Sequence, residues 1–247
     1  MNNTKKIVAI IQARMGSTRL PGKILKTING KTLLEYQLDR VKQSNIINQI
    51  IIATTVKETD QPIVDFCENY GVEYYRGSEN DVLSRYYEAA KSNDGDIIVR
   101  LTSDCPIIDP RIIDKTIIYY LENSSNFDYV SNTVERTFPR GMDTEVFSVN
   151  VLKKAYEEAC LERDREHVTA YFYTNPEVFK IGYISNDKDY GNYRWTVDTS
   201  EDFQLIQLIV NKLYKKNEMF YMEDVIDLLE KHQSWVQLNA HIEQKKI

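Results

Sequence analysis

A short basic loop near the N-terminus is the part of the sequence best suited to chemistry. Residues 12–23 read QARMGSTRLPGK, with two glycines, two hydroxyl side chains and the cations Arg14, Arg19 and Lys23. Glycines permit tight turns, and backbone N–H groups, arginine forks and a lysine are suited to binding a triphosphate. The spacing is neither G-x-x-x-x-G-K-[ST] nor G-x-G-x-x-G. A solvated turn is the alternative, and we favour phosphate binding because three cations gather here in an acidic chain.

Two aspartates follow expected strands and are the next candidates. Asp104 lies in a TSDCP segment, and Asp198 lies in a WTVDT segment that leads into a helix. Ligands of open α/β sheets bind at the C-terminal ends of strands, so both aspartates are expected to face the basic loop. The neighbouring Ser200, Glu201 and Asp202 are better explained by helix capping and by the helix dipole.

Alternating strand and helix patterns must position these groups. Short β-branched runs alternate with longer helical patterns, which indicates an α/β fold of βαβ units around a mainly parallel sheet. We expect strands at 7–11, 49–53, 72–75, 96–101, 129–131, 144–148, 179–183 and 193–197. We expect helices at 33–43, 61–70 (closed by Gly71), 81–91, 111–122, 151–162, 200–214 and 221–244. Residues 1–247 form one predicted domain, with a peripheral insertion at about 125–190 and a helical tail at 218–247.

Composition excludes several classes of protein. The chain has 247 residues, 42% of them hydrophobic, and a net charge of −6, so we expect no general affinity for nucleic acid or anionic membranes. No apolar run approaches the roughly 20 residues needed to span a bilayer, and the N-terminus does not resemble a signal peptide. The three widely spaced cysteines fit a reducing compartment, and we expect a cytoplasmic protein.

The segment 10–23, IIQARMGSTRLPGK, resembles the opening motif of cytidylyltransferases that make CMP-activated acidic sugars, above all the branch linked to spore-coat polysaccharide biosynthesis. TSDCP and WTVDT follow in the order that the family has. The resemblance implies a Rossmann-like α/β/α sandwich of the nucleotide-diphospho-sugar transferase type. It implies transfer of CMP from CTP, or another NTP, to a small anionic sugar-like acceptor, with pyrophosphate as the leaving group, for surface polysaccharide or glycan synthesis.

The resemblance also assigns roles to the residues named above. Asp104 and Asp198 would bind Mg²⁺, which usually uses one or two carboxylates plus substrate phosphates. Lys23 and Arg14, with the two aspartates, would form the catalytic set, in which positioning and charge neutralisation supply most of the rate. The predicted nucleotide-binding residues are Gln12, Ala13, Arg14, Gly16, Ser17, Thr18, Arg19, Lys23, Gly77, Ser78, Asp81, Thr102 and Ser103.

Acceptor binding is predicted in the second half of the chain. Contacts to acceptor hydroxyl or anionic groups are expected from Arg140, Asp143, Glu145, Arg165 and His167. The first three stand in a PRGMDTEVF stretch that is nearly as well explained as a surface turn, and a lone histidine is more often structural than a proton carrier. At the base site, a helix-capping role is an equal alternative for Ser78 or Asn80.

Two other functional classes remain open, and the resemblance further implies a homodimer formed through the insertion. A glycosyltransferase can share this fold, but it predicts an Asp-x-Asp pair, and Asp104 has no such partner. A nucleotide-binding regulator without turnover would be expected to lack one of the two metal acids, and both are present.

Overall fold

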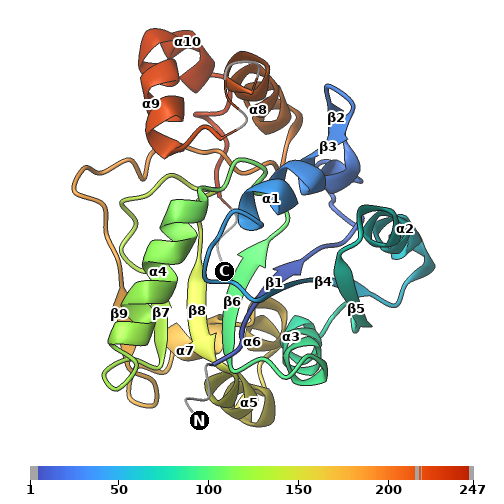
Figure 1. The fold of residues 1–247 in the computed structure, drawn as a ribbon, viewed down its shortest axis with the longest axis vertical. Coiled ribbons are helices and arrows are strands. Elements are labelled where there is room, and N and C mark those ends of the chain that lie inside the picture. The colour runs from blue at the N-terminus through green and yellow to red at the C-terminus, as the bar shows by residue number, and fades with distance from the viewer. Residues whose placement is uncertain (1–4, 215–216, 218, 245–247) are drawn as a thin grey trace.

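A seven-stranded sheet forms the centre of the fold (Figure 1). The structure is a computed structural model that describes residues 5–214, 217 and 219–244. The strand order is β5-β4-β1-β6-β8-β7-β9, and β8 runs antiparallel to both neighbours while the other pairs are parallel. The strands are β1 (Ile7–Gln12), β4 (Gln49–Thr55), β5 (Glu73–Gly77), β6 (Ile97–Thr102), β7 (Tyr129–Ser131), β8 (Glu145–Ser148) and β9 (Ile181–Tyr183). This arrangement confirms the predicted α/β class and its mainly parallel mixed sheet.

Helices cover both faces of the sheet, which explains why the inner strand β1 is apolar along most of its length. In β1, Ile7, Ala9 and Ile11 face one core while Val8 and Ile10 face the other, as expected for a parallel strand buried on two sides. The first core contains α1 (Leu33–Val41), α2 (Gln61–Tyr70), α4 (Pro110–Glu122), α8 (Ser200–Leu213) and α9 (Met222–Lys231). The second core contains α3 (Val82–Ser92), α5 (Val149–Glu158) and α7 (Ala170–Tyr173).

Local signals set several helix ends. Gly71 ends α2 with φ 74°, which confirms its predicted left-handed cap. Asp81 begins α3 by accepting a hydrogen bond from the Ser84 N–H. At the start of α8 the cap is Thr199, and Asp202 completes a capping box with it, so the prediction of Ser200 as the cap was one residue late.

The predicted strand 193–197 is wrong. It contains an isolated bridge between Arg194 and Arg140 in place of a strand ladder. The Trp195 N–H donates to the Arg140 carbonyl at 2.7 Å, and the Val197 N–H donates to the Asp104 carbonyl at 2.8 Å. The Arg140 N–H also donates to the Tyr193 carbonyl at 3.0 Å. The segment is therefore bonded to two different loops without forming a ladder, and its apolar alternation reflects burial.

Two predicted helices are shorter than expected. The helix predicted at 151–162 ends at Glu158, and a separate helix, α6 (Glu162–His167), follows it. The tail predicted as continuous helix over 221–244 contains α9 and α10 (Gln233–Val236), then turns. Residues 218 and 245–247 of the predicted tail lie outside the described residues.

The segment 125–190 supplies strands β7, β8 and β9 to the central sheet as well as α5, α6 and α7. That this segment is a peripheral insertion, separate from the rest of the domain, stays a prediction.

A hairpin that was not predicted joins β2 (Thr27–Ile28) to β3 (Lys31–Thr32) through Asn29 and Gly30, both with positive φ. Asn-Gly is a sequence pair typical of such turns. Within the described ranges, no helix has the length and apolar character that crossing a bilayer requires.

Candidate nucleotide and metal site

The basic loop follows β1, and a buried carboxylate holds its backbone in place. The Met15 N–H donates to Asp60 Oδ1 at 2.7 Å, and the Thr55 hydroxyl donates to the other oxygen of the same carboxylate. Gly22, with φ 64°, closes the loop by donating its N–H to the Met15 carbonyl at 3.1 Å. Asp60, which is 2% exposed, therefore fixes the shape of this loop, a role that the sequence analysis missed.

Lys23 brings the two candidate aspartates together. It begins the short 3-10 helix η1 (Lys23–Leu25). Its Nζ lies 2.7 Å from Asp198 Oδ1 and 3.4 Å from Asp104 Oδ2. Since one nitrogen contacts both carboxylates, these oxygens can be no farther apart than the two distances combined, although 94 residues of chain separate them. Loop and carboxylates thus share one site.

The other oxygen of Asp198 faces two arginines. Arg19 Nη2 lies 3.1 Å from Asp198 Oδ2, and Arg194 Nη2 lies 2.7 Å from the same atom. Arg194 also forms an ion pair with the buried Asp202, whose Oδ1 is 2.9 Å from Arg194 Nε. Arg194 was not among the predicted site residues. Its position directly before WTVDT was the available signal.

Hydrogen bonds between backbone groups, and one from the Gln37 side chain, hold together the segments that carry these side chains. The Ser103 N–H donates to the Gln12 carbonyl at 3.1 Å, which ties the end of β6 to the end of β1. Gln37 Nε2 donates to the Thr102 carbonyl at 2.8 Å. With the bond between Val197 and Asp104 described above, these contacts explain how carboxylates distant in sequence meet at one sheet edge.

Electrostatic coupling keeps the central pair charged. Burial alone would raise the pKa of Asp104, but the Lys23 ammonium and the hydroxyls of Thr102 and Thr196 outweigh it and lower the pKa to about 2. Burial alone would lower the pKa of Lys23, and the charges of Asp104 and Asp198 reverse this and raise it. Both groups are therefore ionised at neutral pH.

The donor set at this site fits a hard divalent cation that also binds phosphate. Asp104 and Asp198 offer carboxylate oxygens, the ligand type that Mg²⁺ prefers. The described part of the chain has no group of three or more His, Cys, Asp and Glu side chains arranged to hold a metal. A Mg²⁺ ion here would therefore depend on the nucleotide's phosphates and on water for its remaining ligands.

Arg14 differs from the other two loop cations. Its side chain is exposed and forms no ion pair with the described residues. It lies near Arg85, a buried guanidinium that donates to the Ser78 carbonyl at 2.6 Å and has no carboxylate partner in the described ranges. Burial lowers the pKa of Arg85, and the charge of Arg14 acts in the same direction. Arg14 in the basic loop and Arg85 in α3 are thus neighbouring cations. Arg85 is a third residue, after Asp60 and Arg194, that was not predicted from the sequence.

Some of the predicted base-site residues are exposed, and others already form hydrogen bonds or ion pairs within the protein. The cap of α3 is Asp81, not Ser78 or Asn80 as the capping alternative had it, and Asp81 also forms an ion pair with Arg165. Ser78 is exposed at the end of β5. Gln12 Oε1 accepts a hydrogen bond from Arg100 Nη2 at 3.1 Å.

Of the predicted acceptor residues, Glu145 and Arg165 are engaged inside the protein. Glu145 is 6% exposed; its Oε1 accepts from the Tyr129 and Thr169 hydroxyls at 2.5 and 2.7 Å, and its Oε2 pairs with Arg100. Arg165 donates to the Tyr156 carbonyl at 2.7 Å besides pairing with Asp81. A direct contact of these two side chains with an acceptor would require breaking internal bonds.

The remaining predicted acceptor residues are more accessible. Asp143 forms a two-point ion pair with Arg136 at 2.7 and 2.9 Å. The Arg140 guanidinium has no hydrogen-bond partner among the described side chains, and its pKa is lowered by burial and by the nearby Arg136. His167 is half-buried, and burial lowers its pKa.

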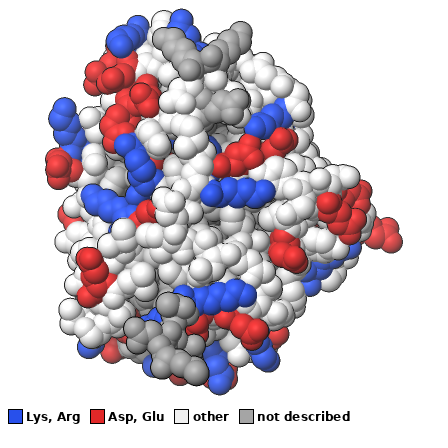
Figure 2. Space-filling view, viewed as in Figure 1, with Lys and Arg blue, Asp and Glu red and all other residues white. Residues whose placement is uncertain are grey.

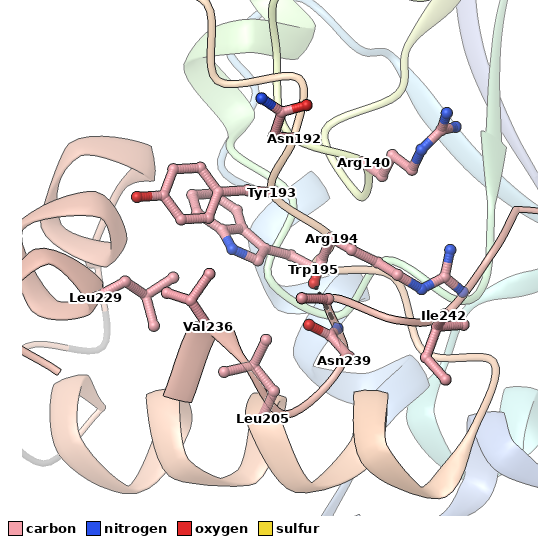
Figure 3. A pocket seen from close by; sticks show the side chains of 11 residues that line it. Arg140, Asn192, Tyr193, Arg194, Trp195, Leu205, Leu229, Val236, Asn239 and Ile242 are labelled. Atoms are coloured by element: carbon pink, nitrogen blue, oxygen red, sulfur yellow. Dashed lines mark hydrogen bonds between the residues drawn. The ribbon is translucent and has the colours of Figure 1, made fainter. Parts of the chain in front are cut away.

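A cavity of about 90 Å³ lies behind Arg194, between the 192–195 segment and the C-terminal helices (Figure 3). Leu205, Leu229 and Val236 form part of its apolar lining, and Asn192 and Asn239 contribute polar groups. The buried indole Nε1 of Trp195 has no hydrogen-bond partner in the described residues. Figure 3 shows the Arg140 side chain pointing away from this cavity. The cavity is smaller than a nucleotide and borders the Asp198 site through Arg194 alone.

Known proteins resemble this chain over almost its whole length. A family model described as cytidylyltransferase matches residues 8–247. The spore coat polysaccharide biosynthesis protein SpsF of Bacillus subtilis is 34% identical over 233 residues, which cover 92% of this chain and 95% of that protein.

Solved structures share the fold. A cytidylyltransferase from Leptospira borgpetersenii superposes with a TM-score of 0.90 at 37% identity, covering 98% of this chain and 100% of that one. A CMP:2-keto-3-deoxy-manno-octonic acid synthetase complexed with CTP superposes with a TM-score of 0.63 at 17% identity, covering 84% and 99%, a likeness in fold alone. With the family match and the identity to SpsF, these findings show that this chain belongs to the cytidylyltransferase family.

Proposed function

We propose that this protein transfers CMP from CTP to a small acidic, sugar-like acceptor with release of pyrophosphate, in the synthesis of a surface polysaccharide or glycan. The proposal rests on one observation: Lys23 forms ion pairs with both Asp104 and Asp198, and the basic loop that carries Lys23 also carries Arg14 and Arg19. The name of SpsF and the CTP bound to the synthetase of similar fold support the choice of substrates.

The residues of the basic loop receive the triphosphate in this proposal. Arg14, exposed and without an ion pair in the described chain, makes the first contact with the phosphates. Arg19 is next, because its side chain is 31% exposed and contacts Asp198 at the edge of the site. Lys23 is 11% exposed and neutralises charge on the α-phosphate as the acceptor oxygen attacks and pyrophosphate leaves.

Asp104 and Asp198 would hold a Mg²⁺ ion that neutralises phosphate charge and aligns the displacement. The low pKa of Asp104 keeps this carboxylate ionised and ready to bind a cation through the physiological range. Positioning and charge neutralisation are sufficient for such a transfer, so no covalent intermediate on the protein is required.

The acceptor would bind beside the same carboxylates. Arg140 is the strongest of the predicted acceptor residues, because its guanidinium has no partner among the described residues and its backbone is bonded to the segment that carries Asp198. Asp143 and its partner Arg136 lie on the same loop and could bind hydroxyl groups or a carboxylate. His167 stays a weaker proposal for proton transfer.

The family motif also suggests a homodimer formed through residues 125–190, which sedimentation equilibrium would test. We further propose a cytoplasmic location, supported by the free thiols of Cys67, Cys105 and Cys160.

Acidic and basic side chains are interspersed on the face in Figure 2, with no extended basic patch there. That distribution favours small anionic substrates over nucleic acid on this face.

The test is pyrophosphate release from each of the four NTPs with a panel of acidic sugars, with and without Mg²⁺. We expect release from CTP that needs both an acceptor and the metal and is absent in Asp104→Asn. Nucleotide binding without turnover on any acceptor would instead indicate a regulator. Turnover of a nucleotide-sugar without pyrophosphate release would indicate a glycosyltransferase.

A further inference from the structure

Arg194 differs from the other cations of the site because it is fixed by buried partners. Its Nη2 donates to Asp198 Oδ2 at 2.7 Å and to Asp202 Oδ2 at 3.1 Å, while its Nε donates to Asp202 Oδ1 at 2.9 Å. Its side chain is 6% exposed, against 31% for Arg19 on the same oxygen of Asp198. Arg19 can turn towards a phosphate, whereas Arg194 would leave a buried carboxylate unpaired if it moved.

Asp202 anchors the backbone of Asp198 as well as the arginine. It is fully buried, and its Oδ2 accepts hydrogen bonds from the Asp198 N–H at 2.9 Å and from the Thr199 N–H at 3.1 Å. The main chain and the side chain of Asp198 are therefore both tied to one internal carboxylate.

The C-terminal segment completes this assembly. Asn239, 3% exposed, donates from its single Nδ2 to the Arg194 carbonyl at 2.9 Å and to Asp202 Oδ1 at 2.8 Å. Figure 3 shows its amide next to the Arg194 backbone. Gln244 Oε1 accepts a hydrogen bond from Arg194 Nη1 at 2.6 Å. Residues near the end of the chain thus hold the arginine that contacts Asp198.

We propose that Arg194 is the positioning residue of Asp198 and that Asn239 fixes Arg194 for this task. Arg194 binds Oδ2 of Asp198 and leaves Oδ1 directed at Lys23 and at the cation that accompanies the nucleotide. The C-terminal segment is therefore part of the catalytic apparatus through Asn239, without contacting substrate. This inference rests on the proposed function, since it gives Asp198 a cation to bind.

Asn239→Ala is the test variant because it removes two hydrogen bonds and leaves the ion pairs of Arg194 in place. The measurements are the Kd of Mn²⁺ in the presence of CTP without acceptor, by electron paramagnetic resonance, and the Mg²⁺ concentration for half-maximal pyrophosphate release. We expect both to rise about tenfold, as for other residues that orient a metal ligand. The Kd of CTP in EDTA should stay unchanged.

Asn93→Ala is the matched control. The Asn93 amide also makes two hydrogen bonds, to Gln49 and to the Ala89 carbonyl, beside the start of β1 at the opposite end of the sheet. We expect it to lower the free energy of unfolding without changing Mn²⁺ binding. Arg194→Lys, which keeps the charge but cannot reach both carboxylates, should weaken Mn²⁺ binding at least as much as Asn239→Ala does.

Introducing Asn239→Ala into the Asp198→Asn variant distinguishes a role in positioning Asp198 from a general effect on the stability of the fold. If Asn239 acts through Asp198, adding Asn239→Ala to this variant should weaken Mn²⁺ binding no further, although stability still falls. Wild-type-like Mn²⁺ binding in Asn239→Ala, with a loss of stability equal to that of Asn93→Ala, would overturn the inference and leave the proposed function standing. A wild-type protein that binds neither CTP nor Mn²⁺ with CTP would overturn both.

Discussion

Replacing Lys23 by methionine removes the charge that two carboxylates share while keeping most of the side-chain volume. The pKa of Asp104 falls from an ordinary 3.8 to about 2 in the folded protein, and Lys23 is the largest of the groups that lower it. This net shift, in which burial opposes Lys23 and the Thr102 and Thr196 hydroxyls assist it, corresponds to about 2 kcal/mol of stability, and we take that value as the scale of the Lys23 contribution. Both side chains are less than a quarter exposed, so solvent screens the pair only in part. In EDTA at pH 7 we expect Lys23→Met to lose about 2 kcal/mol, or about 4–8 °C in Tm for a chain of this size.

The sign of the pH dependence follows from the lowered pKa. A carboxylate that titrates lower in the folded state stabilises the protein fully above its unfolded pKa, and this contribution disappears as the pH falls towards 2. The stability gap between wild type and Lys23→Met should therefore be constant from pH 7 to about pH 5 and narrow below pH 4. Urea unfolding, followed by tryptophan fluorescence at several pH values, measures it.

An exposed ion pair provides the control for Lys23→Met. Lys153 pairs with Glu157 at 3.7 Å, and both side chains are more than half exposed, so Lys153→Met should cost at most about 0.5 kcal/mol. Two results would refute the coupling of Lys23 to Asp104. One is a difference in the free energy of unfolding between wild type and Lys23→Met that is the same at pH 3 and pH 7, and the other is a Lys23→Met variant as stable as wild type at pH 7.

Other substitutions test the remaining parts of the site. Asp104→Asn and Asp198→Asn should each lower kcat for pyrophosphate release by about 10²-fold or more, while circular dichroism shows an unchanged fold. Arg14→Gln should raise KM for CTP about tenfold at unchanged Tm, because the side chain is exposed and unpaired in the described chain. Gly141→Ala should cost about 2 kcal/mol or more in urea unfolding, since φ is +102° and a Cβ would lie 2.8 Å from the Trp195 carbonyl carbon.

Local sequence signals predicted the strands and helices whose ends are set by their own residues. The buried run of β1, the cap at Gly71 and the strand 129–131 all appear where expected. The segment 193–197 was wrong because alternating apolar residues mark burial, and only tertiary contacts decide whether a ladder forms. The hairpin at Asn29 and Gly30 was within reach of sequence reasoning, since that pair is a strong turn signal.

In the site, too, some residues could be predicted from local sequence and others could not. The spacing of basic residues pointed to Lys23, and strand ends pointed to Asp104 and Asp198, which the structure brings together. Asp60 was not predicted because its role depends on its contacts with Met15 and Thr55, which no local pattern encodes. Arg194 was not predicted either, although its place directly before WTVDT was a local signal, because its ion pairs with Asp198 and Asp202 are seen only in the folded protein. Glu145 shows the converse: its strand position suggested an available acid, but the partners that bury it come from other elements.

The charges within the site predict that the proposed nucleotide and metal ion bind cooperatively. Three carboxylates already face three cationic side chains there: Asp104, Asp198, Asp202, Arg19, Lys23 and Arg194. A triphosphate that takes Arg19 and Lys23 as ligands removes counter-charges from Asp104 and Asp198, and a divalent cation is the species that can replace them. Nucleotide and metal should therefore each tighten the binding of the other, and this coupling must be equal in both directions. Arg194 and Asp202 remain paired throughout, so Asp198 keeps its orientation while its other partners change.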